Sequence, residues 1–166
     1  KYLAQAVAQT SNAQWRTACE RGFDFMLRSQ YSSGGFPQRF PNPKSYHAHI
    51  TFNDGVMIGI LQVLADASSQ QPYFAWLDDT RRRQATTAVE RGIDCILKCQ
   101  IKVDRHKTGW CQQHDAVSYA PAPARTFELA SICPQETTAI VQFLQQQPAR
   151  SEEVEQAIAA ATDWLK

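Results

Sequence analysis

The sequence predicts an all-α fold, an α/α toroid (α/α barrel) of repeated helical hairpins with long loops. A helical segment, "ACERGFDFMLRSQ" (18–30), returns as "AVERGIDCILKCQ" (88–100). Each copy precedes a loop containing glycine, an aromatic residue and glutamine, and each loop leads to a second apolar helix. Long loops without structure of their own are uncommon unless they are functional. Since solenoid repeats usually have short, regular turns, we favour the toroid over an open solenoid.

The first copy is predicted to begin at Ser11, because Gln14 follows three residues later in a capping-box pattern. Apolar and small residues then recur at helical spacing. This stripe comprises Trp15, Ala18, Cys19, Gly22, Phe23 and Met26. The loop "GGFPQ" (34–38) follows, and the partner helix contains "GILQVL" (59–64). Its buried side is expected to comprise Val56, Met57, Ile60, Leu61 and Leu64.

The second copy repeats this order. Its stripe comprises Ala85, Ala88, Val89, Gly92, Ile93 and Ile96. The loop "GWCQQ" (109–113) and a partner helix containing "AIVQFL" (139–144) follow. A third copy is predicted from Ser151, where neighbouring glutamates suit the helix dipole. Because a third loop and partner helix should follow Lys166, we interpret residues 1–166 as the amino-terminal portion of a truncated array, within one toroid domain.

Composition excludes little. The net charge of +1 gives no general electrostatic case for a nucleic-acid or membrane partner. No apolar run is long enough to span a membrane, and no secretion signal is visible at the first residues. Cys95, Cys99, Cys111 and His114 superficially resemble a zinc site, but helix-packed thiols or one disulfide fit the repeat better. His47 and His49, beside a tyrosine, are interpreted as hydrogen-bonded scaffold.

Two loops carry the candidate chemistry. In "HITFNDG" (49–55), Asp54 precedes an apolar helix, and taken alone it is consistent with a helix N-cap worth about 1 kcal/mol. The second loop concentrates Trp110, His114, Asp115, Tyr119, Arg125, Phe127 and Glu128. Aromatic rings suit sugar faces, carboxylates suit hard cations, and arginine suits a ligand carboxylate. Arg125 and Glu128 are equally consistent with a surface ion pair, and Trp110 with a core residue.

The motifs "GGFPQRFP", "HITFNDG", "GWCQQHD" and "ARTFE", in this order, make the chain resemble the family 10 polysaccharide lyases, which are α/α-toroid pectate lyases. The resemblance covers residues 34–128. It implies a secreted enzyme that cleaves polygalacturonate by β-elimination with calcium as cofactor. In that reaction, removal of the C5 proton builds enolate charge on the C6 carboxylate, and a bound cation stabilises this charge.

The resemblance also assigns roles to individual residues. Asp54 and Asp115 are expected to be the catalytic carboxylates and to serve the calcium ion. Arg125 is expected to contact a substrate carboxylate. Further substrate-binding residues are expected at Trp110, Asn53, His114 and Phe36.

Two departures from the family pattern leave alternatives open. The family's catalytic base is an arginine located downstream of the third copy's first helix, so this chain could bind acidic polysaccharide without cleaving it. In addition, "SICPQE" (131–136) replaces a serine-rich stretch, which leaves the role of Glu136 open. An inverting glycoside hydrolase on the same fold is an alternative, and it needs its two carboxyl groups about 6.5–9.5 Å apart. An open toroid edge also predicts self-association.

Overall fold

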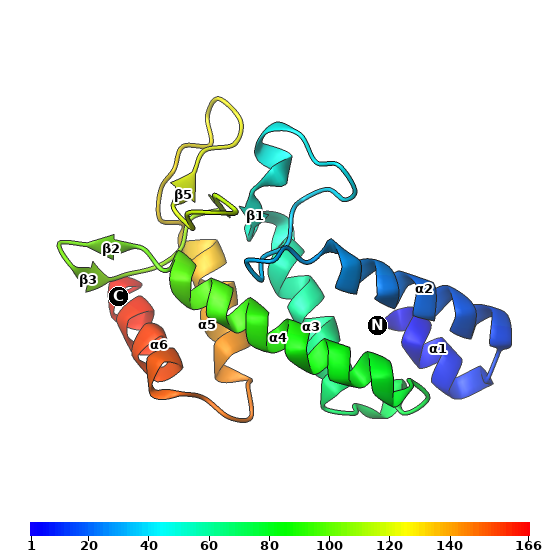
Figure 1. Ribbon diagram of the computed structural model, residues 1–166. Helices are drawn as coiled ribbons and strands as arrows, with labels where there is room; N and C mark the ends of the chain where they lie inside the picture. The colour runs from blue at the N-terminus through cyan, green and yellow to red at the C-terminus, as the bar shows by residue number, and fades with distance from the viewer.

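The computed structural model describes residues 1–166 and is mostly helical (Figure 1). This confirms the prediction of a predominantly α-helical chain. The six α-helices are α1 (Tyr2–Thr10), α2 (Ala13–Ser29), α3 (Val56–Ser68), α4 (Asp79–Cys99), α5 (Pro134–Gln145) and α6 (Glu152–Trp164). The three short 3₁₀ helices are η1 (Ser45–Ala48), η2 (Asn53–Gly55) and η3 (Pro72–Phe74). None of the helices combines the length and apolar character needed to cross a membrane.

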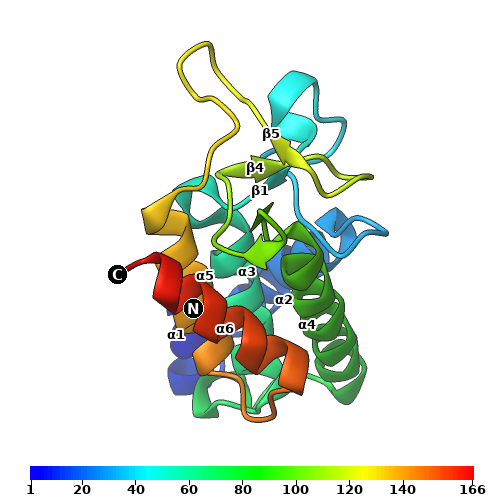
Figure 2. The same ribbon diagram turned by 90° about the vertical axis from the view of Figure 1, so that its left-hand side faces the viewer.

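The helices form hairpins in the predicted order. Long loops join α2 to α3 and α4 to α5, and both loops lie at one end of the helices (Figure 1). Helix α3 packs along α4, and α5 packs along α6 (Figure 2). Helix α6 begins as predicted, because the side chain of Ser151 accepts a hydrogen bond from the N–H of Val154.

The first helix boundary differs from the prediction. Asn12, not Ser11, caps α2: its side-chain oxygen accepts hydrogen bonds from the N–H groups of Gln14 and Trp15. Ser11 instead ends α1 in a left-handed conformation, with φ of 54°. Helix α1 was not predicted; it has only nine residues and buries only Ala4 and Val7.

A cluster of 25 buried residues forms the core. The predicted stripe on α4 is confirmed at Ala85, Ala88, Val89, Gly92 and Ile96, and Cys95 and Cys99 are buried beside it. The matching stripe on α2 is only partly buried. Phe23 is in the core, but Trp15, Ala18 and Gly22 are exposed. All five cysteines are free thiols.

Two glutamines at equivalent positions connect successive repeats. At the end of α2, the Gln30 amide donates to the carbonyls of Gly34 (2.9 Å) and Ala88 (2.8 Å). At the end of α4, the Gln100 amide donates to the carbonyls of Thr108 (2.8 Å) and Ala157 (2.9 Å). Each glutamine therefore connects the loop that follows its own helix to the first helix of the next repeat.

The loops contain short strands that the all-α prediction omitted. Strands β1 (Ile50–Thr51), β4 (Gln113–His114) and β5 (Pro121–Ala122) form an antiparallel sheet in the order β1-β4-β5. Ile50 pairs with His114, and Thr51 pairs with Gln113. A separate hairpin joins β2 (Lys102–Val103) to β3 (His106–Lys107). The three-stranded sheet lies above the helix ends in Figure 2 and determines how the two long loops meet.

Candidate active site

The β1–β4 pair brings the two predicted loops together. The N–H groups of Phe52 and Asn53 extend this contact by donating to the carbonyl of Gln112, at 2.9 and 3.1 Å. Because the strands are antiparallel, the segments that follow β1 and β4 leave the pair at opposite ends. Asp54 therefore lies beyond one end of the strand pair, and Asp115 lies beyond the other.

Asp54 lies in η2, between β1 and α3, and its backbone is left-handed with φ of 55°. The side-chain oxygen of Asn53 accepts the N–H of Asp54 at 2.9 Å and supports this turn. The N-cap of α3 is Gly55, with φ of 67°, and α3 has no side-chain cap. The N-cap interpretation of Asp54 is therefore wrong. The turn exposes the Asp54 carboxylate, which is available to a ligand.

Asp115 is held by its own loop. Its Oδ1 accepts hydrogen bonds from the N–H of Val117 (3.0 Å) and from the N–H and hydroxyl of Ser118 (2.8 and 2.9 Å). The bonds from Ser118 keep the pKa of Asp115 below its usual range, and the neighbouring His49 acts in the same direction. These contacts use one carboxylate oxygen, so Oδ2 remains available to a ligand.

The ion pair considered from the sequence is present in the second loop. The Nε of Arg125 donates to Glu128 at 2.9 Å, and the guanidinium forms a second bond to the other carboxylate oxygen. The hydrogen bonds from Arg125 lower the pKa of Glu128 to about 2. The hydrogen bond to Glu128 raises the pKa of Arg125, and the nearby Tyr46 and Asp54 of the first loop act in the same direction.

Three predicted sugar contacts are wrong, because Phe36, Trp110 and His114 are each 0% exposed. The indole N–H of Trp110 donates to the carbonyl of Ile96 at 2.8 Å, which anchors the second loop to α4. In His114, Nε2 accepts the N–H of Cys111 (3.1 Å) and Nδ1 donates to the carbonyl of Tyr119 (2.9 Å). Burial lowers the pKa of His114 to about 4. These residues support the loops from beneath.

The site differs from the expected set in two further ways. His49 faces Asp115 across the continuation of the strand pair, and Tyr46 lies near Arg125, yet neither was among the predicted site residues. The β-branched and aromatic residues in "HITF" are typical of a strand, and a strand there would have placed His49 beside the second loop.

The carboxylates are suitable oxygen donors for a hard cation, but no three acidic, histidine or cysteine side chains cluster tightly enough to hold a metal by themselves.

The family model described as pectic acid lyase matches residues 1–166. The chain belongs to the pectic acid lyase family. The chain is also similar to two solved structures of the family 10 polysaccharide lyase from Cellvibrio cellulosa. Both have a TM-score of 0.94 and 38% sequence identity, and the match covers 98% of this chain and 51% of theirs. One of them is a mutant in complex with trigalacturonic acid. No curated protein matches the chain.

The chain thus spans about half the length of these solved chains. The resemblance seen in the four loop motifs is confirmed, because both comparisons identify the same family. Within this family member, Asp54, Asp115 and Arg125 are the predicted site residues whose charged groups lie at or near the loop surface.

Proposed function

We propose that this chain is part of a pectate lyase that cleaves polygalacturonate by β-elimination. The observation that carries the proposal is that the β1–β4 pair joins the two loops that carry two available carboxylates and one arginine, in a member of the pectic acid lyase family. Support for the substrate comes from the similar Cellvibrio cellulosa enzyme, which was solved with trigalacturonic acid. A galacturonate chain presents carboxylates and hydroxyls, and these groups match the side chains on the two loops.

In this reaction a base removes the C5 proton, a C4–C5 double bond forms, and the glycosidic oxygen leaves C4. Negative charge builds on the C6 carboxylate in the transition state. Arg125 suits contact with a uronate carboxylate, and Glu128 holds its guanidinium in a defined orientation. The hydrogen bonds to Oδ1 of Asp115 fix that carboxylate, which leaves Oδ2 to face a cation or a sugar hydroxyl. The base itself is proposed to come from a part of the protein outside residues 1–166.

We propose calcium as the cofactor, with Asp54 and Asp115 as its protein ligands. Carboxylate oxygens are the preferred ligands of this ion, which takes six to eight oxygens in total. Because these side chains supply only part of that number, uronate carboxylates and water would supply the rest. Bound calcium would neutralise the substrate carboxylate and thereby make the C5 proton more acidic.

The same reasoning extends to the architecture. We propose that residues 1–166 form part of a single catalytic domain that closes into an α/α toroid, because successive hairpins repeat with their loops at one end. Since polygalacturonate is a cell-wall polymer, we propose that the protein acts outside the cell.

The test is ultraviolet absorbance of the conjugated product when polygalacturonate is mixed with this chain and, separately, with a longer protein that contains it. Each assay is run with calcium and with a chelator. Calcium-dependent absorbance from the longer protein, lost in Asp54→Asn and Asp115→Asn but retained in Lys102→Gln on the β2–β3 hairpin, is the expected result. Asn tolerates the left-handed backbone at position 54, so that variant tests charge alone.

Other outcomes lead to different conclusions. Reducing sugar released without conjugated product would indicate the inverting hydrolase instead. Because the chain spans about half of its solved relatives, the binding-only alternative applies to the 166-residue chain by itself. Calcium-dependent binding of polygalacturonate without turnover would support that alternative.

A further inference from the structure

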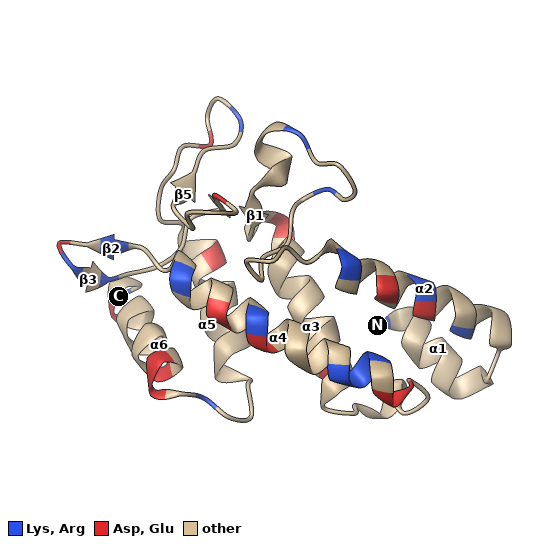
Figure 3. Cartoon of the chain, viewed as in Figure 1, with Lys and Arg blue, Asp and Glu red and all other residues tan.

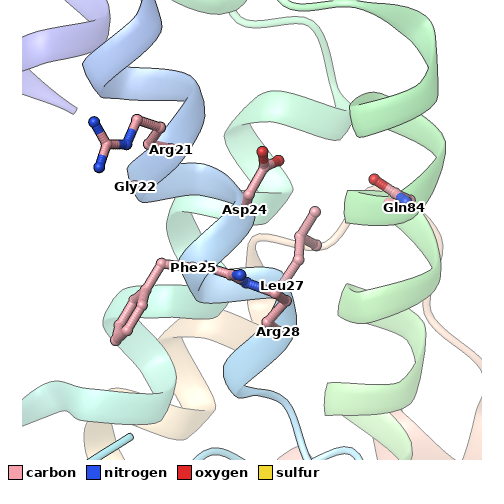
Figure 4. Close-up of a pocket in the computed structure, with 7 residues that line it drawn as sticks. All are labelled: Arg21, Gly22, Asp24, Phe25, Leu27, Arg28 and Gln84. Atoms are coloured by element: carbon pink, nitrogen blue, oxygen red, sulfur yellow. The ribbon is translucent and has the colours of Figure 1, made fainter. Parts of the chain in front are cut away.

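A groove runs between α2 and α4, away from the two catalytic loops. It consists of two adjoining cavities of about 720 and 440 Å³, which share Leu27, Arg28 and Gln84 as lining residues. Figure 4 shows part of it: Arg28 and Leu27 project from α2, and the Gln84 amide extends from α4 toward α2. Cavities of this size accept small ligands or a few units of a polymer.

The groove has an excess of unpaired positive charge. Arg21, Arg28, Arg83 and Arg91 line it, and none of them forms an ion pair. The only carboxylate in the lining is that of Asp24. Both of its oxygens accept hydrogen bonds from Arg81, at 2.7 and 2.8 Å. These bonds lower the pKa of Asp24, and the charge of Arg28 acts in the same direction. One carboxylate therefore faces four groove arginines, which leaves a net positive charge in the groove. Figure 3 shows basic residues along both helices.

This arrangement is specific to the groove. The other arginines of α2 and α4, Arg16, Arg81 and Arg82, each pair with a carboxylate. If the ion pairs were distributed at random, paired and unpaired arginines would be mixed along both helices. The four groove arginines instead form no ion pair, and the groove lining holds a single carboxylate, that of Asp24.

The remaining lining suits a carbohydrate. Phe25 is 43% exposed in the same depression, and its ring meets the ring of Phe40 edge-on at 5.5 Å between centroids. An exposed aromatic ring offers a stacking surface for the apolar face of a sugar. The side-chain amide of Gln84 can bond to hydroxyl groups, and each guanidinium can bind a carboxylate through two N–H groups.

The groove also connects with the first catalytic loop. At its far end, Nη2 of Arg91 donates to the carbonyl of Tyr31 at 2.6 Å, at the base of that loop. Phe40, which contacts Phe25, belongs to the same loop. A polymer lying along α2 and α4 would therefore extend toward the candidate active site.

We propose that the α2–α4 groove is a second binding site for a carboxylate-bearing polysaccharide and holds a stretch of polyuronate outside the catalytic loops. The groove itself is argued from its arginines and Phe25, while the choice of polyuronate among polyanions rests on the proposed function. Its binding needs no calcium, because arginines rather than a cation meet the carboxylates.

The test is affinity electrophoresis of the 166-residue chain through gels containing polygalacturonate and a chelator. The groove variant is Arg28→Gln/Arg83→Gln. The matched control is Lys102→Gln/Arg105→Gln on the β2–β3 hairpin, which removes the same charge from an exposed site elsewhere. Circular dichroism verifies that both variants fold. The groove variant is expected to bind about five- to tenfold more weakly than the control, from two partly exposed charge contacts.

Further arms separate this site from the catalytic loops. An Arg125→Gln variant is expected to keep its chelator-resistant retardation. Loss of that retardation in the Arg125 variant, with normal retardation of the groove variant, would place the ligand at the loops and overturn only the groove proposal. Absence of any chelator-resistant binding would overturn it as well.

The ligand class is tested with two competitors. Fully methyl-esterified pectin is expected to bind far more weakly, because its carboxyl groups are neutral methyl esters. Retardation by this pectin equal to that by polygalacturonate would overturn recognition of carboxylates. Equally strong binding of single-stranded DNA would indicate a general polyanion surface and would overturn the assignment to polysaccharide.

Discussion

At the scale of single residues, buried polar groups hold the exposed ones in place. His114 has no exposed surface, yet both of its ring nitrogens are hydrogen-bonded to backbone groups of the loop that carries Asp115. Thr51 and Gln113, also buried, pair across the strands that join this loop to the one carrying Asp54. Since a misplaced carboxylate loses its contacts with a ligand, these supports determine the geometry of the site.

The burial of His114 predicts a pH-dependent stability. Its pKa is lowered to about 4 in the folded chain, whereas an unfolded histidine titrates near 6.5. The unfolded state therefore binds the additional proton between these values, so stability is complete above about pH 6.5 and falls as the pH decreases toward 4. The expected loss between pH 7 and pH 4.5 is roughly 2 to 3 kcal/mol, measured by urea unfolding across this range.

His114→Gln is the informative variant, with His106→Gln, at an exposed histidine on β3, as its control. The first variant is expected to be less stable at pH 7 but to lose less stability on acidification. The control is expected to retain the pH dependence of the parent chain. Identical slopes for all three proteins would show that His114 does not cause the effect.

At the scale of elements, the same sequence pattern has different consequences in the two copies. Gly22 on α2 and Gly92 on α4 occupy equivalent repeat positions. A Cβ added to Gly92 would lie 2.4 Å from the side chain of Leu61 on α3, whereas nothing lies within 4 Å of one added to Gly22. Gly92 therefore permits the close approach of α3 to α4, and Gly22 faces open space.

This contrast predicts opposite effects of one substitution. Gly92→Ala is expected to destabilise the chain by about 1 to 3 kcal/mol, because Leu61 is fully buried and overpacking forces it from its position. Gly22→Ala is expected to be neutral or to stabilise by up to about 1 kcal/mol, because alanine favours a helix. Urea unfolding of both variants measures the difference. Equal destabilisation would mean that a hidden contact covers Gly22.

At the scale of the whole molecule, one apolar surface remains open. A cavity of about 240 Å³ between α1 and α2 is lined mainly by apolar side chains, among them Leu3, Phe23 and Met26. Trp15 is 43% exposed on the same helix pair. Contiguous apolar surface of this kind usually marks a contact with another part of a protein.

We therefore expect the 166-residue chain to self-associate with increasing concentration. Sedimentation velocity over a range of concentrations measures this directly. Leu3→Ser/Trp15→Ser is expected to shift the distribution toward monomer, while Val117→Ser, at a residue equally apolar but located in the second loop, leaves it unchanged. A parent chain that stays monomeric at every concentration would contradict the prediction.

The sequence by itself determined the features that are local. Apolar periodicity predicted α2 to α6, Ser151 predicted the start of α6, and the loop motifs identified the family. These succeed because helix spacing and short motifs depend on neighbouring residues.

Only the tertiary structure decided which of the apolar side chains are buried by other segments of the chain. Phe36 and Trp110 are buried rather than presented to a sugar, Asp54 does not cap α3, and the stripe of α2 stays partly exposed. The β1–β4 pairing, which brings Asp54 and Asp115 to one sheet, joins residues far apart in the chain. An amphipathic pattern specifies an apolar side but not its partner, because burial depends on segments that only folding brings into contact.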